Sequence, residues 1–294
     1  MEWFMKKIFS ILLSIILAVG VLSGCSMNAG AKNSTNVTAR QDKQIPASCT
    51  LSESNGNYNY SYNNSSNTLT ITDNTPSPDW EKPRLTNFKA WLVPLFNTTA
   101  KETQQALLLA LAENIDTYDG QSVITYYLYA NCPLIADGTI THINYKSNKE
   151  YGDESHTFTA KNGQVASVDG NKIFRNKEGK ITKIGDESIQ YKKSGNSSKM
   201  IFYDPHCYIN YDELGRIKSF VDNRAGAVGI TTTYKYSGNN TLPTSIVIEE
   251  DGGEGDQTTA TITLLIEGDN VSRININTNG SYNTEFSYQY QTLF

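Results

Sequence analysis

The sequence predicts a mostly β fold, in which a smaller N-terminal part with one helix precedes an antiparallel meander that forms an open curved sheet or a partial barrel. Two observations predict it. After about residue 139, short runs rich in tyrosine, isoleucine, valine and threonine alternate with polar turns, which is typical of strands joined by hairpins. Strong helix-forming residues with an apolar face are confined to residues 99–114.

The chain begins with a basic and then apolar segment. Lys6 and Lys7 precede an apolar run from Ile8 to Leu22. A bilayer core about 30 Å thick needs about 20 helical residues, so this run is short for a membrane span and fits a secretory signal peptide. It ends in Leu22-Ser23-Gly24-Cys25, where small residues can lie extended in a peptidase cleft and the thiol can be alkylated by lipid.

This segment resembles the lipobox of bacterial lipoproteins. The resemblance implies transfer of a diacylglyceryl group to Cys25 and cleavage after Gly24, so that residues 1–24 are a lipoprotein signal peptide. It also implies acylation of the new amino group, for example with palmitate. Three acyl chains exceed the two lipid signals that stable anchoring requires. We therefore expect an extracytoplasmic protein anchored to the outer membrane or to the outer face of the cytoplasmic membrane; the alternative is an ordinary signal peptide.

Two segments are expected before the meander. Residues 25–50 carry almost no large apolar side chains, which predicts a disordered tether. Residues 51–138 should form an N-terminal α+β part: a hairpin from residue 58, an irregular core segment around Trp91, a helix at 99–114 and a strand at 121–130 that is apolar on both faces. Thr99 and Glu102 have the spacing of a capping box at the start of the helix.

The meander, residues 139–294, contains a recurring unit of glycine, a polar residue, Ile or Val, two polar residues and a second apolar residue. The glycine supplies a positive φ in the turn. Both apolar residues need cover although they stand three apart, so a bulge or a twist is predicted between them. The copies lie at 163–168, 179–184, 215–220 and, in degenerate form, 268–274.

The third copy, Tyr211-Asp212 followed by Gly215-Arg216-Ile217, resembles the Rhs/YD repeat. The chain is also similar to uncharacterised lipoproteins of gut bacteria, which carry such a meander and a Leu-Pro-Thr turn like the one at 242–244. The resemblance covers about residues 150–294 and implies the architecture of the meander. Long YD arrays form shells around a toxin, but four loose copies are not expected to form such a shell.

Charge and composition exclude some classes of partner. Residues 1–24 contain Glu2, Lys6 and Lys7, so their removal lowers the net charge from −5 to −6. An acidic chain with scattered basic residues is not expected to bind nucleic acid or anionic lipid by charge. The three cysteines after Cys25 allow at most one disulfide, and we favour the interpretation that all three are buried and pack as apolar side chains. They are Cys49, Cys132 and Cys207.

No catalytic, cofactor-binding or metal-binding residue is predicted. The histidines, His142, His156 and His206, stand in no metal or nucleophile motif. His206 and Cys207 are neighbours in a predicted strand and should point to opposite faces. Asp153, Glu154, Asp186 and Glu187 are interpreted as turn residues. The sequence also contains an acidic cluster, which is predicted to be a solvated hairpin tip; Ca²⁺ binding is the alternative. Its residues are Glu249, Glu250, Asp251, Glu254 and Asp256.

Three functions are compatible with these features. The first is a non-enzymatic binding or interaction module of the cell envelope, with the membrane as one partner and a protein or a glycan as a possible second. The second is a carbohydrate-active lipoprotein, because some of the 18 tyrosines could stack on sugar rings. The third, an accessory to a secreted toxin, depends on the YD resemblance alone. We expect the Tyr pairs 234/236 and 288/290 to face the core, with Lys235 and Gln289 pointing outward.

Overall fold

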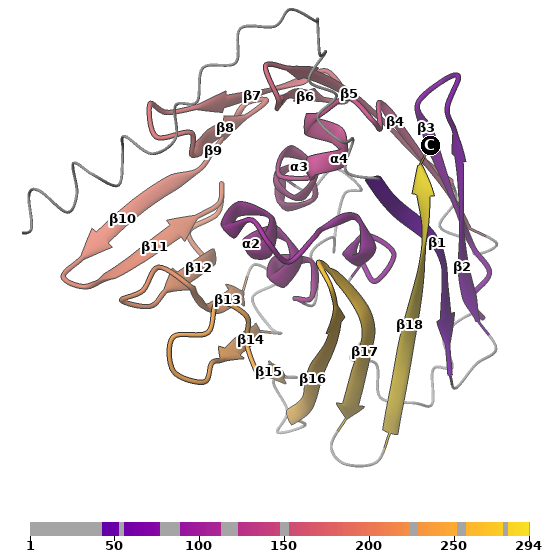
Figure 1. Ribbon diagram of the computed structural model, residues 1–294. Helices are drawn as coiled ribbons and strands as arrows, with labels where there is room; N and C mark the ends of the chain where they lie inside the picture. Colours follow the sequence, from indigo (N-terminus) through magenta and orange to yellow (C-terminus); the bar gives the residue numbers. More distant parts are fainter. Residues whose placement is uncertain are drawn as a thin grey trace, which may run out of the picture. The chain divides into compact units, whose positions relative to one another are not determined.

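The computed structural model describes residues 43–52, 56–76, 89–112, 123–147, 153–223, 229–251, 257–278 and 282–293. The predicted signal peptide, Cys25 and the tether up to residue 42 lie outside these ranges. The described residues form an 18-stranded sheet, three α-helices and one 3-10 helix (Figure 1). None of these helices is long and apolar enough to cross a bilayer.

The first half of the described chain contains all of its helices. Its elements are β1 (Lys43–Leu51), β2 (Asn57–Asn63), β3 (Thr68–Asp73), η1 (Val93–Leu95), α2 (Lys101–Ala110), α3 (Val123–Ala130), α4 (Pro133–Ala136), β4 (His142–Ser147), β5 (Glu154–Lys161), β6 (Gln164–Val168) and β7 (Asn171–Arg175). The elements that follow are β8 (Ile181–Ile184), β9 (Glu187–Ser188), β10 (Gln190–Ser194), β11 (Ser197–Ile201), β12 (Cys207–Tyr211), β13 (Ile217–Asp222), β14 (Gly229–Lys235), β15 (Ser245–Asp251), β16 (Gln257–Glu267), β17 (Asn270–Thr278) and β18 (Tyr282–Leu293).

The strands form one mixed sheet that nearly closes into a barrel. From β4 to β9 and from β10 to β18, each strand pairs antiparallel with the next. β18 pairs with β1, β1 with β2 and β2 with β3, whereas β3 and β4 form a parallel pair. Between β9 and β10 stands Ile189, whose amide donates to the Thr182 carbonyl of β8 at 2.8 Å. The predicted fold class, a mostly β meander in a partial barrel, is confirmed.

The helices lie inside the curve of the sheet (Figure 1). α3 packs against β6 and β8, α2 against β13, α4 against β5, and η1 against β1 and β17, so distant strands surround one helical core. The four repeat strands, β6, β8, β13 and β17, are completed by the other 14 strands of the sheet, and the sheet encloses helices of its own chain.

Side chains from the sheet bind the C-terminal carbonyls of the enclosed helices. The Tyr234 hydroxyl donates to the carbonyl oxygen of Leu108 near the end of α2 at 2.7 Å. Arg175 donates from Nη2 to the carbonyl of Ala130 at the end of α3 at 2.8 Å. The last four carbonyls of a helix have no partner within the helix, and a cation there also complements the helix dipole.

The prediction of a strand at 121–130 is wrong, because Val123–Ala130 form helix α3. Every residue of α3 is buried. A short apolar run does not distinguish a buried strand from a buried helix by its periodicity. A helix pairs its own backbone groups, so it can fill the interior of a barrel whose strands already pair with one another.

The helix predicted at 99–114 is present but begins and caps differently. α2 spans Lys101–Ala110, and its N-cap is Ala100, which makes no side-chain cap hydrogen bond. The Thr99 hydroxyl instead lies 3.2 Å from the side-chain oxygen of Asn97. The predicted capping box between Thr99 and Glu102 is therefore wrong, because the helix starts one residue later than that box requires.

The predicted tether is wrong for residues 43–50, which belong to strand β1. Only one face of a strand needs apolar residues when the other faces solvent. Ile45 and Cys49 are fully buried there, and Pro46 stands at a register shift in the pairing with β18, where a missing amide donor is tolerated. Residues 42–294 form one compact unit, so the predicted parts 51–138 and 139–294 share a sheet and a core.

The bulge predicted within the repeat is present in all four copies. In each copy the residue after the first apolar position has no partner in the neighbouring strand's register; these residues are Ala166, Thr182, Lys218 and Ser272. The extra residue turns both flanking apolar side chains to the same face. The pairs that are buried in this way are Val165 and Val168, Ile181 and Ile184, Ile217 and Phe220, and Val271 and Ile274.

Candidate functional site

The four tyrosines on which the glycan hypothesis depended are structural. Tyr234 and Tyr288 are buried, and Tyr236 and Tyr290 are half-buried. Each hydroxyl donates to a backbone carbonyl, those of Tyr236 and Tyr290 reaching Ile217 and Val271. Lys235 and Gln289 are exposed as expected. The prediction that these tyrosines face the core is confirmed, and they do not form an exposed aromatic strip.

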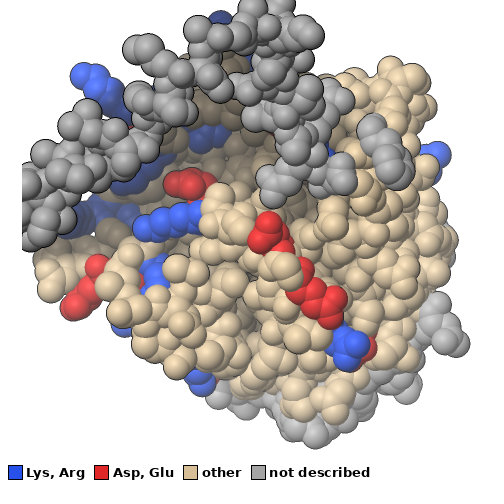
Figure 2. All heavy atoms as spheres, viewed as in Figure 1, with Lys and Arg blue, Asp and Glu red and all other residues tan. Residues whose placement is uncertain are grey.

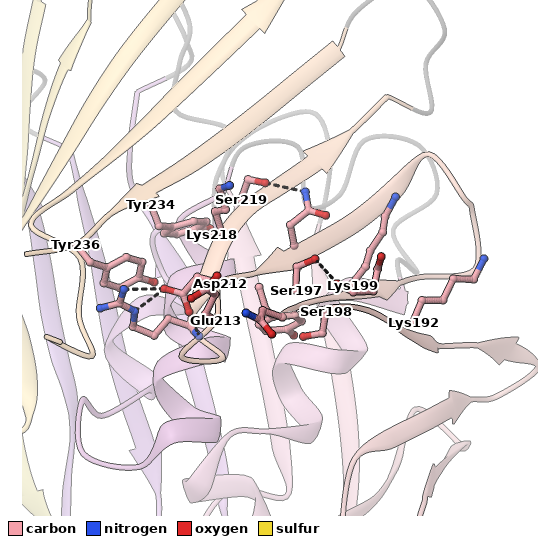
Figure 3. Close-up of a pocket in the computed structure, with 15 residues that line it drawn as sticks. Lys192, Ser197, Ser198, Lys199, Asp212, Glu213, Lys218, Ser219, Tyr234 and Tyr236 are labelled. Carbon is pink, nitrogen blue, oxygen red and sulfur yellow. Dashed lines mark hydrogen bonds and ion pairs between the residues drawn. The ribbon is translucent and has the colours of Figure 1, made fainter. Parts of the chain in front are cut away.

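A hollow of about 1080 Å³ lies where the β10–β11 hairpin, the β12–β13 turn and the end of β14 meet (Figure 3). Its volume is at the upper end of the roughly 300–1,000 Å³ that is typical of ligand pockets. Four cationic, two acidic, six serine or asparagine and three tyrosine residues line it: Lys192, Lys199, Arg216, Lys218, Asp212, Glu213, Ser194, Ser197, Ser198, Ser219, Asn196, Asn210, Tyr211, Tyr234 and Tyr236. In Figure 2, blue Lys and Arg side chains gather around a hollowed part of the left of the surface, over β10–β12.

Cross-strand register places part of this lining in one row. Lys192 of β10 lies opposite Lys199 of β11, which lies opposite Asn210 of β12, which in turn lies opposite Ser219 of β13. Directly opposed residues of neighbouring strands point to the same face. The row is therefore basic at one end and neutral polar at the other. Lys218, the unpaired residue of the bulge, lies next to Ser219 at the neutral end of the row.

The Tyr-Asp…Gly-Arg motif forms the wall of the hollow beside this row. Asp212 Oδ1 accepts hydrogen bonds from the amides of Leu214 at 3.0 Å and Arg216 at 2.9 Å. Asp212 Oδ2 accepts from Arg216 Nε at 2.7 Å. Burial alone would raise the pKa of Asp212, but the backbone and guanidinium hydrogen bonds from Arg216 hold it below its usual value. Gly215 completes the turn with φ +73°.

Arg216 also fixes the loop between β14 and β15. Its Nη1 donates to the carbonyls of Gly238 at 2.8 Å and Asn240 at 2.9 Å, and its guanidinium lies 4.3 Å from the centre of the Tyr236 ring. The guanidinium is therefore engaged on both edges and one face. The motif positions the rim of the hollow and leaves ligand contacts to other side chains.

Three lysines of the hollow have no anionic partner in the described part of the chain. Neither Lys192 nor Lys199 nor Lys218 forms an ion pair with a described residue. The Lys199 ammonium lies 3.1 Å from the centre of the Tyr208 ring, which is a cation–π contact. Like charges opposite each other on neighbouring strands destabilise a sheet, so the Lys192–Lys199 pair costs stability unless an anion lies between the two side chains.

A second polar cluster surrounds His156 on β5. Its imidazole Nδ1 lies 2.7 Å from Asp169 Oδ2, and its Nε2 lies 3.5 Å from Glu154 Oε2. Burial alone would lower the pKa of His156, but the two carboxylates raise it to about 9. The imidazolium in turn holds the pKa of Glu154 below its usual value. His156 is 5% exposed and packs on the Tyr129 ring with 5.0 Å between ring centres, so the imidazole is buried beneath its partly exposed carboxylate partners.

The other histidines and cysteines are dispersed. His142 and His206 are exposed, whereas Cys207 is buried, so the adjacent His206 and Cys207 face apart. Cys49, Cys132 and Cys207 are buried and do not form a disulfide with one another, and burial raises the pKa of Cys49 and Cys132 to about 12. Among the described side chains, no group of three His, Cys, Asp or Glu could hold a metal ion.

The acidic tip of β15 is only partly described. Glu249 is exposed, and burial raises the pKa of the half-buried Glu250. Glu254, Asp256 and the side chain of Asp251 lie outside the described residues. Of the four acidic residues interpreted as turn residues, Asp186 lies in a turn, and Asp153 accepts a hydrogen bond from the Ser147 amide ahead of β5. Glu187 lies in β9, and Glu154 lies in β5 and belongs to the His156 cluster, so the interpretation is wrong for these two.

The lysines of the hollow were missed by reasoning from the sequence, which treated the basic residues as scattered. The sequence does contain a signal that pairs two of these lysines, Lys192 and Lys199. The turn residues Gly195 and Asn196 centre a hairpin, and counting outward from them places Lys192 opposite Lys199. Lys218 carries no such signal, because its position depends on the bulge and on the packing of β13 beside β12.

The chain is similar in part to a solved structure. A porin-like protein from Bacteroides vulgatus ATCC 8482 matches 49% of this chain and 96% of its own length, with 12% sequence identity and a TM-score of 0.29. A likeness at that score carries no weight for function. No protein-family model and no curated protein matches the chain.

Proposed function

We propose that the protein is a lipid-anchored, extracytoplasmic binding module of the cell envelope, and that the hollow between β10 and β14 is its ligand site. The observation that carries the proposal is the set of unpaired lysines in that hollow. Lys192, Lys199 and Lys218 line it on a chain whose net charge is −5, although the repulsion between the opposed Lys192 and Lys199 costs stability. Residues that lower stability without a structural return are typical of binding sites.

The anchor is supported by the sequence. The basic and apolar N-terminal run and the Leu22-Ser23-Gly24-Cys25 box support lipid attachment at Cys25. Attachment there would hold the binding module at a membrane through residues 26–42, ahead of β1.

A hydrolytic role has less support from the same hollow. Glycosidases use a pair of carboxyl groups that flank the scissile bond. The two acidic residues of the lining are Asp212 and Glu213, and Asp212 is engaged by Arg216 through its side chain and backbone. Of the described lining residues, this leaves Glu213 as the one carboxylate that is not held in an ion pair.

The proposal is tested by binding of the detergent-solubilised full-length protein to polysaccharide and protein fractions of the cell envelope. The test variant is Lys192→Gln/Lys199→Gln/Lys218→Gln. The matched control, Lys161→Gln/Lys177→Gln/Lys235→Gln, removes the same charge from exposed lysines outside the hollow. We expect the hollow variant alone to lose binding. Equal binding by both variants, or release of cleaved sugar that Glu213→Gln abolishes, would overturn the proposal.

A further inference from the structure

The geometry of the hollow points to an acidic polysaccharide as its ligand, a hydroxyl-rich polymer that carries carboxylates or phosphates. This inference rests on the proposed function. The charge of the lining sets the sign of the ligand. With Asp212 neutralised by Arg216, three lysines face one remaining carboxylate, Glu213.

The spacing of the lysines favours a polymer over a small anion. Lys192, Lys199 and Lys218 stand on β10, β11 and β13. Strands lie about 4.8 Å apart in a sheet, so these positions extend over about 14 Å. One carboxylate or phosphate can contact one or two of these ammonium groups, whereas anionic groups spaced along a chain can contact all three.

The neutral part of the lining favours a sugar over an acidic peptide. Six serine and asparagine residues line the hollow, and no aliphatic side chain is among the described residues that do. The Ser194 and Ser198 hydroxyls and the Asn196 side-chain amide form no hydrogen bond with another described residue, so they are available to sugar hydroxyls. The apolar surface of the lining comes from three tyrosine rings and from lysine methylenes, and the described lining residues form no aliphatic pocket of the kind that anchors an apolar peptide side chain.

The pre-formed rim indicates that the site does not need the ligand in order to fold. The Asp212–Arg216 pair, the two carbonyls that Arg216 binds and the Tyr236 ring beside it hold the β12–β13 turn against the loop that follows β14. Lys192 and Lys218, by contrast, are exposed and lie free of ion pairs with described residues, so their replacement should leave the fold intact.

The test is a titration of the full-length protein with matched polymers at 0.15 M salt. Polygalacturonate supplies carboxylates and phosphomannan supplies phosphates. Fully methyl-esterified polygalacturonate and dephosphorylated mannan are their uncharged counterparts, and polyglutamate is the acidic peptide. We expect at least one acidic polysaccharide to bind, and its uncharged counterpart to bind more weakly by about tenfold or more, the effect of one charge-assisted hydrogen bond.

The variants assign the binding to the hollow. The Lys192→Gln/Lys199→Gln/Lys218→Gln variant should lose about tenfold or more in affinity, while the control triple variant should bind as the wild type does. Raising the salt to 1 M shortens the Debye length from about 8 Å to about 3 Å and should weaken binding further. Comparison of the two acidic polysaccharides identifies the anionic group.

Several results would overturn the inference. They are equal binding of charged and uncharged sugars, tighter binding of polyglutamate than of either acidic polysaccharide, and binding that the hollow variant retains. If no acidic polysaccharide binds while the hollow variant still loses its binding to envelope fractions, the inference fails and the proposed function stands. If binding to envelope fractions does not depend on the hollow, the proposed function fails as well.

Discussion

Replacing His156 with glutamine should remove a pH-dependent part of the stability of the barrel. The imidazole links β5, which carries Glu154, to Asp169 in the turn between β6 and β7. It is 5% exposed, and Lys89 approaches the same Glu154 carboxylate at 3.9 Å. The two carboxylates favour the imidazolium, and they raise the pKa of His156 from 6.5 to about 9 although burial opposes this.

The direction and size of the effect follow from proton linkage. Between pH 6.5 and 9 the folded protein binds a proton at His156 that the unfolded chain releases, so the free energy of unfolding falls as the pH rises. The stabilisation is complete below about pH 6.5 and is lost as the pH rises through about 9. A pKa difference of this size corresponds to about 3 kcal/mol, with a slope of at most about 1.4 kcal/mol per pH unit.

The assay is urea unfolding at closely spaced pH values from 6 to 10. We expect His156→Gln to be less stable than the wild type by about 3 kcal/mol at pH 6 and to approach it near pH 10. His142→Gln, a change at an exposed histidine, is the control and should keep the slope of the wild type. A wild-type unfolding free energy that is flat from pH 6.5 to 9, or a slope that His156→Gln leaves unchanged, would refute the reasoning.

Three further substitutions test the anchor, the repeat turn and the enclosed helices. Cys25→Ser should block palmitate labelling and leave the precursor uncleaved on immunoblots; normal processing and membrane retention would contradict the lipoprotein interpretation. Gly215→Val places a β-branched residue at φ +73° and should cost about 1–3 kcal/mol in urea unfolding, whereas Leu214→Val beside it should have little effect. Tyr234→Phe removes one of the two donors of the buried Leu108 carbonyl, which keeps the Leu111 amide at 3.3 Å, and should cost about 0.5–1.5 kcal/mol in thermal unfolding; an unchanged melting temperature would show that this contact is not stabilising.

Local sequence rules were sufficient where one turn and its two strands decide the structure. Ile217 and Phe220 are three apart and both apolar, which required a bulge, and the bulge is present. Asp212 and Gly215 form the turn because an Asx side chain binds nearby amides and glycine accepts a positive φ. Asn176 acts in the same way in the second copy, where it accepts hydrogen bonds from the amides of Glu178 and Lys180 at 3.0 Å.

Local rules failed where burial depends on the whole barrel. The run Val123–Ala130 is helical because it lies inside the nearly closed sheet, and nothing within those eight residues specifies that location. Residues 43–50 form a strand because β18 and β2 are available to pair with it on either side. Both partners follow β1 in the chain, and β18 lies at its far end. In each case the missing information was the identity of the neighbouring strands.

The candidate site shows the same division. The Tyr-Asp…Gly-Arg motif that the sequence indicated proved to be the scaffold of the hollow, through Asp212 and Arg216. The lysines that give the hollow its charge come from three strands, and only register and the bulge at Lys218 bring them together. His156 stands in no motif of the sequence, and its burial between two carboxylates depends on the approach of the turn at Asp169, which periodicity does not reveal.

The central claim, that the hollow is where the protein meets its ligand, is tested most directly by lysine footprinting in isolated cell envelopes. Acetylation of Lys192, Lys199 and Lys218 is compared with that of Lys161, Lys177 and Lys235, in the envelope and in the purified full-length protein. We predict that the three lysines of the hollow are protected in the envelope relative to the purified protein, while the other three react equally in both. Equal reactivity of all six lysines in both preparations would contradict the claim.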